Sequence, residues 1–512
     1  MDRQIRRLGI AFVALFVVLF AQVAYVQVVA AQRIAADPAN APRQIAAQYS
    51  VERGQILAAN LTTVLATSDP NPDPESPYRF LRRYPGGPLW GQITGYYSRI
   101  YGLTGLELAM DPYLSGTAPE FTTQNLTDIV FGRPKHGGTV ITTLVPRIQA
   151  AAAKALGDNE GAVVAFDPRS GDILAMYSNP SFDPNPISTG TPDQMRTAWE
   201  RVTTDPGRPL VSHAFQDLYL PGSSFKTITA SAALENEWGP DKTWKNPHQL
   251  ELPGTDAHIE NFGNEFCNGG ASTVTMMEAF EESCNVTFAE IGLALGADKL
   301  ARQAQAYGLC RTQPVENVAT SCVDDTIPFI LNGWQTARFP DPSYFDQNDA
   351  ALARSAIGLD NDQVNPLHLG LIAAAIANGG TMYEPRLVTE VRDSTTGETL
   401  RSFAPAEYSH PLTAANAAEL RKMMVGVVES GTGYLAQIPG VTVAGKTGTA
   451  GNIEGPPNAW FTSFAPAGDG QQARIAVAVI VLDGGALGSE ATGGQVAAPI
   501  AKAVMESCGC LG

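Results

Sequence analysis

Strand-like segments at two distant places in the chain constrain its fold more than any other feature. The stretch "GAVVAFDPRSGDILAMYS" (residues 161–178) contains two apolar runs joined by a turn, as in a β-hairpin. Near the C-terminus, "VTVAGKTG", "AWFTSFAPA" and "ARIAVAVIVLD" are strand-like, and "GGQVAAPIAKAVMES" is helical. Helical patterns such as residues 366–377, ended by Asn378-Gly379-Gly380, lie between. This order predicts an α+β domain whose five-stranded antiparallel sheet is completed by both ends and flanked by helices.

The length of 512 residues predicts more than one domain. We expect a cytoplasmic tail at 1–7, a membrane-spanning segment at 8–31, a non-catalytic domain at 32–145 and a catalytic domain at 146–512. The stretch "YSVERGQILAANLTTVLATS" (residues 49–68) reads as two short strands joined by a polar turn, so the non-catalytic domain is expected to be mainly β.

The N-terminal apolar run indicates attachment to a membrane. Arg3, Arg6 and Arg7 precede an uncharged segment, residues 8–31, which is long enough to span a bilayer. The positive charges favour a cytoplasmic N-terminus and an extracytoplasmic remainder. A cleaved signal peptide is the alternative, since Val29-Ala30-Ala31 offers small residues for cleavage. The length of the apolar run favours a retained anchor.

Charge and metal-ligand patterns exclude several function classes. A net charge of −17 without basic clusters argues against nucleic-acid binding. The six histidines are scattered and form no H-E-x-x-H motif, so we expect no metal and no other cofactor. Six cysteines fit an oxidising compartment, and the pairs Cys267/Cys284 and Cys310/Cys322 are the predicted disulfides. Cys508 and Cys510 receive no assignment.

The stretch "YLPGSSFKTITASAALE" carries the first candidate for catalysis. A helical pattern begins directly after Pro221-Gly222, which puts Ser223 at a helix N-terminus, where developing negative charge is favoured. Lys226 follows three residues later on the same helix face. A serine beside a lysine amine is a nucleophile with its own base. From these residues alone, a simple helix-capping role for Ser223 is equally consistent.

The segment from Gly440 to Thr447 matches the phosphate-binding pattern G-x-x-x-x-G-K-T, but its flanks do not fit a nucleotide hydrolase. Val441-Thr442-Val443 is β-branched, and the glycines and prolines after Thr447 cannot carry the required helix. The segment is better interpreted as a β-strand that carries Lys446 near its end. A second cation beside Lys226 would lower its pKa, as a neutral base requires.

The residues after Lys446 are the predicted substrate-binding group. Thr447 and Thr449 can donate hydroxyl hydrogen bonds to a carboxylate, and Gly448 lets a substrate backbone lie against the strand. The backbone N–H groups of Ser223 and Thr449 are the predicted oxyanion hole. Ser283 and Asn285, which bracket Cys284, are the third candidate pair, able to relay a proton and to hold a substrate amide.

The ordered motifs Ser223-x-x-Lys226, Ser283-x-Asn285 and Lys446-Thr447-Gly448 resemble those of penicillin-binding proteins and serine β-lactamases. The segments "ERGQILA", "GLTGLELAMDPYLSG" and "YLPGSSFK" look like those of class B penicillin-binding proteins, and most like the penicillin-binding protein A family of actinobacteria. Leu359 stands where that family often has Gln. The resemblance implies a membrane-anchored, extracytoplasmic D,D-transpeptidase, with a penicillin-binding transpeptidase domain behind a smaller N-terminal domain.

The resemblance also implies the substrates and partners. Ser223 would attack the penultimate D-Ala carbonyl of a peptidoglycan stem peptide ending in D-Ala-D-Ala, and β-lactams would acylate the same serine. Lys226 and Ser283 remain alternative proton acceptors at each step. Wall-synthesis or division proteins would bind through the N-terminal domain.

Related activities are the alternatives. A D,D-carboxypeptidase would use water as acceptor, and a β-lactamase would also need an acidic residue to activate that water, for which the sequence offers no convincing candidate. The first 145 residues are too few for an added glycosyltransferase domain. A β-lactam sensor would need cytoplasmic signalling sequence. A non-catalytic wall-synthesis scaffold is the most distant alternative.

Overall fold

The central sheet of the protein is assembled from the two ends of its larger part, as the sequence predicts. The computed structural model describes residues 2–30, 41–122, 134–312, 322, 326–452 and 455–511. Five antiparallel strands lie in the order β19-β20-β21-β7-β8. Their bounds are β7 (Gly161–Asp167), β8 (Asp172–Asn179), β19 (Ala444–Asn452), β20 (Gly455–Ala465) and β21 (Ile475–Val481). Strand β19, which carries Lys446, therefore forms an edge of this sheet.

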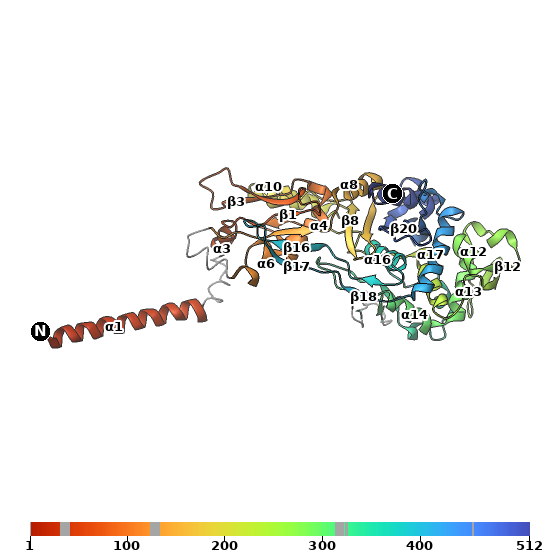
Figure 1. Ribbon diagram of the computed structural model, residues 1–512, viewed down its shortest axis with the longest axis horizontal. Coiled ribbons are helices and arrows are strands. Elements are labelled where there is room, and N and C mark those ends of the chain that lie inside the picture. Colours follow the sequence, from red (N-terminus) through yellow and green to blue (C-terminus); the bar gives the residue numbers. More distant parts are fainter. Residues whose placement is uncertain are drawn as a thin grey trace.

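Helices cover both faces of the five-stranded sheet because its strands are apolar on both sides (Figure 1). Along β7, Val163 and Ala165 pack with helices α8 (Pro146–Leu156) and α18 (Gly493–Ser507). Phe166 points to the opposite face, against helix α16 (Pro366–Ala377). At Gly370 of α16, a Cβ would lie 2.6 Å from the Phe166 ring, so this glycine lets the helix approach the sheet closely.

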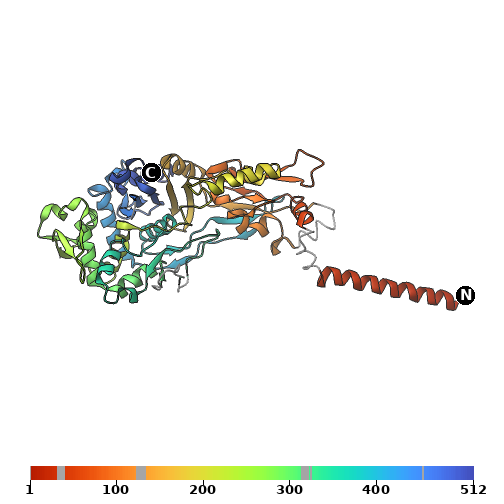
Figure 2. The same ribbon diagram turned by 180° about the vertical axis from the view of Figure 1, so that it is seen from behind.

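A helical layer with two small two-stranded sheets lies at the end of the molecule opposite the N-terminus (Figures 1 and 2). Its helices are α11 (Lys226–Leu234), α12 (Met276–Glu281), α13 (Asn285–Leu295), α14 (Ala297–Ala306), α15 (Asp349–Ser355) and α17 (Ala414–Glu429). One small sheet pairs β9 (Thr243–Lys245) with β12 (Thr273–Thr275), and the other is a hairpin of β10 (Gln249–Glu251) and β11 (His258–Glu260). The N-termini of α11 and α13 bring the Ser223 and Asn285 motifs towards β19.

A second sheet lies on the side of the N-terminus and mixes strands from distant parts of the chain. Its order is β17-β16-β6-β1-β2-β3. The N-terminal part supplies β1 (Ile56–Leu57), β2 (Val64–Pro70), β3 (Phe80–Arg83) and β6 (Thr139–Thr142), and a much later segment supplies β16 (Val388–Arg392) and β17 (Thr399–Ser402). Short helices α5 (Gly105–Ala109) and α6 (Asp111–Leu114) pack beside it. The N-terminal part contains short helices as well as strands, and its sheet is completed by strands from beyond residue 145.

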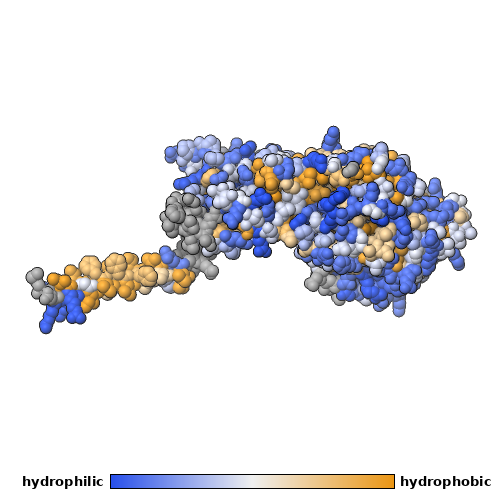
Figure 3. Space-filling view, in the orientation of Figure 1, coloured by the Kyte–Doolittle hydropathy of each residue, from blue (hydrophilic) through white to orange (hydrophobic). Residues whose placement is uncertain are grey.

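The N-terminal helix stands apart from the remainder. Helix α1 (Asp2–Ala24) continues into a π-helical turn, η1 (Tyr25–Val29), and the span Arg3–Val29 is long and apolar enough to cross a membrane. None of its most apolar stretch is buried against the protein. Figure 3 shows it as a continuous hydrophobic surface with a hydrophilic end. An exposed apolar helix of this length fits a membrane anchor.

Candidate active site

Ser223 and Lys226 meet at the start of helix α11. A 3₁₀ turn, Gly222–Phe225, precedes the helix, and Gly222 has φ +52° in the region that favours glycine. A Cβ on Gly222 would lie 2.4 Å from the Thr449 carbonyl oxygen, so glycine also permits close contact with β19. Lys226 Nζ lies 3.0 Å from Ser223 Oγ. The lysine amine is thus within hydrogen-bonding distance of the serine oxygen.

Ser283 and Asn285 approach the same lysine from the turn between α12 and α13. Ser283 has φ +62°, an uncommon conformation for a serine. Lys226 Nζ donates to the Ser283 carbonyl oxygen at 2.6 Å and to Asn285 Oδ1 at 2.8 Å. Asn285 Nδ2 in turn donates to the Glu260 carbonyl oxygen at 3.0 Å, which orients the amide. The turn therefore holds Lys226 beside Ser223.

Lys446 completes the arrangement from strand β19. Its side chain is fully buried, and Nζ donates to Ser283 Oγ at 2.8 Å and to the Thr447 carbonyl oxygen at 3.0 Å. Ser283 Oγ also lies 3.4 Å from Lys226 Nζ. The Ser283 hydroxyl therefore bridges the two lysine amines.

Burial without a carboxylate partner lowers the pKa of both lysines. Desolvation is the main cause of the lowered pKa of Lys226, and the charge of nearby Lys446 lowers it further, to well below its ordinary value. Desolvation lowers the pKa of Lys446 to about 7. The lowered pKa favours the neutral form of the Lys226 amine. A neutral amine 3.0 Å from a serine oxygen can accept its proton.

The three residues after Lys446 belong to the edge strand β19 and contact the elements beside it. A Cβ on Gly448 would lie 2.2 Å from Ser224 Oγ and 2.9 Å from the Pro221 carbonyl oxygen, so β19 passes directly against the Ser223 turn. Thr447 Oγ1 lies 2.6 Å from Thr432 Oγ1, and Thr449 Oγ1 accepts from Gly493 N at 3.3 Å. Since Lys446 and Thr447 lie inside a strand, the phosphate-loop pattern lacks the helix that it needs.

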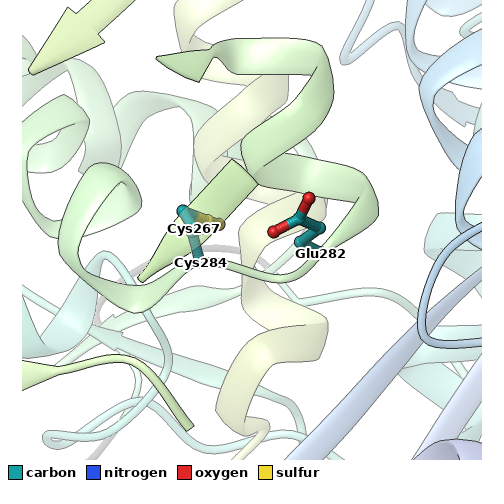
Figure 4. A group of neighbouring side chains, drawn as sticks. All are labelled: Cys267, Glu282 and Cys284. Atoms are coloured by element: carbon teal, nitrogen blue, oxygen red, sulfur yellow. A yellow bond between two sulfur atoms is a disulfide. The ribbon is translucent and has the colours of Figure 1, made fainter. Parts of the chain in front are cut away.

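Three disulfide bonds are present among the described residues. They join Cys267 to Cys284, Cys310 to Cys322, and Cys508 to Cys510. The last bond, between residues two positions apart, was not anticipated. The first ties the turn that carries Ser283 to a neighbouring loop. Figure 4 shows Glu282 beside this bond, but the two sulfurs are bonded to each other and cannot serve as thiolate ligands of a metal.

The structure adds side chains that the motifs do not reveal. Thr432 contacts Thr447 from the loop between α17 and β19. Asn261 Oδ1 accepts from Val286 N at 3.1 Å and so fixes the start of α13. A lone threonine between two glycines, Gly431 and Gly433, carries no recognisable signal, and the contact only exists once the chain has folded.

Comparison with known proteins gives matches over almost the whole chain. Residues 161–506 match the penicillin-binding protein transpeptidase domain, and residues 53–140 match the penicillin-binding protein A dimerisation domain. The peptidoglycan D,D-transpeptidase PbpA of Mycolicibacterium smegmatis is 37% identical over 99% of this chain and 98% of its own length. PbpA of Mycobacterium tuberculosis is 36% identical over 99% of both chains.

Solved structures resemble the fold equally well. Penicillin-binding protein A of M. tuberculosis, as a ceftriaxone acyl-enzyme complex, has a TM-score of 0.79 and 36% identity over 90% of this chain and 99% of its own. Its penicillin G acyl-enzyme complex has a TM-score of 0.77 and 36% identity over 90% of this chain and 100% of its own.

Proposed function

The chain belongs to the class B penicillin-binding protein transpeptidases, and from this membership we propose that it cross-links peptidoglycan stem peptides through a Ser223 acyl-enzyme. The substrate would be a stem peptide ending in D-Ala-D-Ala. β-Lactams, which formed the acyl-enzymes of the M. tuberculosis relative, would acylate the same serine here.

In the acylation step, Lys226 Nζ takes the Ser223 hydroxyl proton as Oγ attacks the penultimate D-Ala carbonyl carbon. The backbone N–H groups of Ser223 and Thr449 stabilise the oxyanion of the tetrahedral intermediate. Collapse of that intermediate breaks the peptide bond. The terminal D-Ala leaves after its nitrogen receives a proton, delivered by Lys226 directly or through the Ser283 hydroxyl, which contacts both lysines.

In the transfer step, an amine of a neighbouring stem peptide attacks the acyl-enzyme carbonyl. The amine loses a proton to the site, Ser223 Oγ regains one, and an amide cross-link replaces the ester. Asn285 would hold the substrate amide, while Lys446 and the hydroxyls of Thr447 and Thr449 would attract and bind the terminal carboxylate. Gly448 would leave room for the substrate backbone along the edge of β19.

One observation carries this proposal: Lys226, fully buried and beside a second lysine, has Nζ 3.0 Å from Ser223 Oγ. A serine that only capped the helix would need no amine whose pKa has been lowered. Three separate elements contribute to this arrangement. The Ser283 turn contacts the Lys226 amine of helix α11, and Lys446 of strand β19 contacts the Ser283 hydroxyl.

Mass analysis after incubation with benzylpenicillin tests the proposal. The full chain in detergent should acquire a long-lived adduct on the peptide that contains Ser223, and Ser223→Ala should not. Ser224→Ala is the matched control, because the buried Ser224 hydroxyl has no hydrogen-bond partner within the described residues and its removal should leave the adduct intact.

Other outcomes separate the alternatives. Rapid consumption of the drug without a lasting adduct would point to a hydrolase of the β-lactamase type. An adduct together with release of D-Ala but no cross-linked product from a stem-peptide pair would point to a carboxypeptidase. Neither adduct nor consumption, with Ser223→Ala still active in cells, would favour a non-catalytic scaffold.

We also propose that residues 8–31 anchor the protein in the cell membrane, with residues 1–7 cytoplasmic and the catalytic part outside. The arginines at positions 3, 6 and 7 support this orientation, and the disulfide bonds support an oxidising compartment. Protease added to intact spheroplasts should digest the catalytic domain and spare a cytoplasmic marker. Protection of the domain would contradict this topology.

We propose a division into an N-terminal domain at 32–145 and a transpeptidase domain at 146–512. Strands β16 and β17 of the second range add to the sheet of the N-terminal domain. The N-terminal part is where wall-synthesis or division proteins would bind. Its match to a dimerisation domain supports a role in association. Crosslinking in cells from positions in this sheet, compared with positions near β20, tests it.

A further inference from the structure

We propose that Thr432 is a positioning residue for substrate recognition. Its hydroxyl donates a hydrogen bond to Thr447 Oγ1 and so directs the Thr447 hydrogen at the substrate's terminal carboxylate. The two oxygens lie 2.6 Å apart. This inference rests on the proposed function, since it adds a residue to the carboxylate-binding group on β19.

The directing effect follows from the number of hydrogens available. Each threonine hydroxyl has one hydrogen to donate and two lone pairs that can accept. Thr449 Oγ1 accepts from the backbone N–H of Gly493 at 3.3 Å, which leaves its hydrogen free for a ligand. Thr447 keeps its hydrogen free only if Thr432 is the donor of their shared bond. A carboxylate accepts but cannot donate, so its binding favours this arrangement.

The chain of hydrogen bonds also strengthens each of its members. When Thr432 donates to Thr447, the polarised Thr447 hydroxyl becomes a better donor to the charged carboxylate. Hydrogen bonds to charged groups are the stronger ones in proteins. Thr447 is only 6% exposed, so water is a poor substitute for the Thr432 hydroxyl.

The backbone around Thr432 is held on two sides, which fixes the hydroxyl in place. Thr432 N donates to the Glu281 carbonyl oxygen at 3.3 Å, and Gly433 N donates to the Val427 carbonyl oxygen at 2.8 Å. A Cβ on Gly494, at the start of α18, would lie 2.2 Å from the Thr432 carbonyl oxygen. The loop is therefore packed between the end of α12 and the start of α18.

These contacts also join Thr432 to the Ser283 turn. Glu281, whose carbonyl accepts from Thr432, is the last residue of α12 and lies two positions before Ser283. The same short loop thus contacts the carboxylate-binding strand through its hydroxyl and the catalytic turn through its backbone. A valine at position 432 would remove the hydroxyl contact and retain the shape of the side chain.

Acylation by benzylpenicillin and by its methyl ester tests the inference. In the ester the carboxylate is neutralised, so the Thr447 hydrogen has no charged acceptor. We expect Thr432→Val to slow acylation by benzylpenicillin about fivefold, because the variant removes one neutral hydrogen bond between two hydroxyls. Acylation by the ester should stay within about twofold of that of the unchanged chain, so the ratio of the two rates identifies the effect.

Two further variants complete the design. Thr432→Ser keeps the hydroxyl and should restore most of the rate with benzylpenicillin. Ser430→Ala removes an exposed hydroxyl of the same loop, which bonds only the Gly426 carbonyl oxygen within the described residues, and should change neither rate. Thermal unfolding of each variant shows whether the fold is retained.

The results that overturn the inference are distinct from those that overturn the proposed function. Equal slowing with both compounds would show a structural role for Thr432, and no slowing with either would show no role. If Thr432→Val unfolds, Thr432→Ser decides the question. Equal slowing of Thr432→Ser with benzylpenicillin and with its methyl ester would then also show a structural role alone. Absence of any adduct in the unchanged chain would instead overturn the proposed function, and the role of Thr432 with it.

Discussion

At the scale of single residues, the site is built around two buried amines that lack a carboxylate partner. Lys226 and Lys446 are fully buried, and their Nζ atoms bond only to neutral oxygens among the described residues. Burying a charge without an opposite charge is costly, so the site favours one neutral amine. The same cost that creates a base at neutral pH must then reduce the stability of the fold.

We predict that the free energy of unfolding of Lys446→Met, minus that of the unchanged chain, decreases as the pH rises from 7 to 9. The pKa of Lys446 is about 7 in the folded chain and 10.5 in the unfolded one, so between these values the unfolded state binds more protons. The stability of the unchanged chain therefore rises with pH by up to about 1.4 kcal/mol per unit. The variant lacks this term. Denaturant titrations of both proteins across this range measure it.

A constant difference in unfolding free energy between the two proteins would contradict this prediction. Lys422→Met is the matched control. Lys422 is an exposed lysine of α17 whose pKa is raised by its bond to Glu419, so its loss should not produce a difference that grows between pH 7 and 9.

At the scale of elements, β19 packs directly against the Ser223 turn because Gly448 has no side chain. Gly448 has an ordinary extended backbone, and only space demands the missing side chain. The atoms nearest to an added Cβ would be Ser224 Oγ, the Pro221 carbonyl oxygen and Ser224 N at 2.2, 2.9 and 3.0 Å. Two of these belong to the backbone of the turn, which would have to move.

We predict that Gly448→Ala slows acylation by benzylpenicillin about 100-fold, because a displacement near 1 Å at a reacting group has effects of this size. Gly451→Ala on the same strand is the control, since no atom lies within 4 Å of its added Cβ. Stopped-flow or quenched labelling gives the rates. A rate for Gly448→Ala within about twofold of that of the unchanged chain would show that the turn yields without consequence.

The elements that could be predicted from the sequence are those with a local cause. Pro366 and Asn378-Gly379-Gly380 mark the ends of α16, and the glycines and periodicity of residues 493–507 mark α18. The apolar, β-branched runs predicted the five-stranded sheet. The pairing of Val388 with Thr142 spans 246 positions and leaves no local pattern, so the composition of the second sheet was not foreseen. The Thr432 contact was missed for the same reason.

At the scale of the whole molecule, the N-terminal part and the part matched to the transpeptidase domain cannot separate without breaking strand pairs. Strand β16 pairs with β6, which pairs with β1, so part of the region matched to the transpeptidase domain lies in the N-terminal sheet. Arg386 pairs with Asp172 at the start of β8, and Thr143 Oγ1 donates to the Ile173 carbonyl oxygen at 2.6 Å. These contacts join the sheets and predict that the two parts unfold together.

A buried charge cluster in the N-terminal part makes this cooperativity testable. Glu107 is fully buried and accepts from Arg53 Nε at 2.6 Å and Arg82 Nε at 2.5 Å. Burial alone would raise the pKa of Glu107, but Arg82 and Arg53 lower it below its ordinary value. The carboxylate is therefore charged at neutral pH. Glu107→Gln would leave two buried guanidinium groups undercompensated, at a cost of about 3 kcal/mol.

We predict that Glu107→Gln lowers the midpoint of thermal unfolding by roughly 3 °C and lowers by the same amount the temperature at which labelling by a fluorescent penicillin is lost. The mutated site lies in the N-terminal part, so a shared shift requires the sheets to unfold as one. Asp111→Asn removes a carboxylate that is 41% exposed and pairs with Arg53, and should cost less than about 1 kcal/mol. If penicillin labelling survived to the unchanged temperature while the N-terminal part melted early, the strands of β16 and β17 would not couple the two parts.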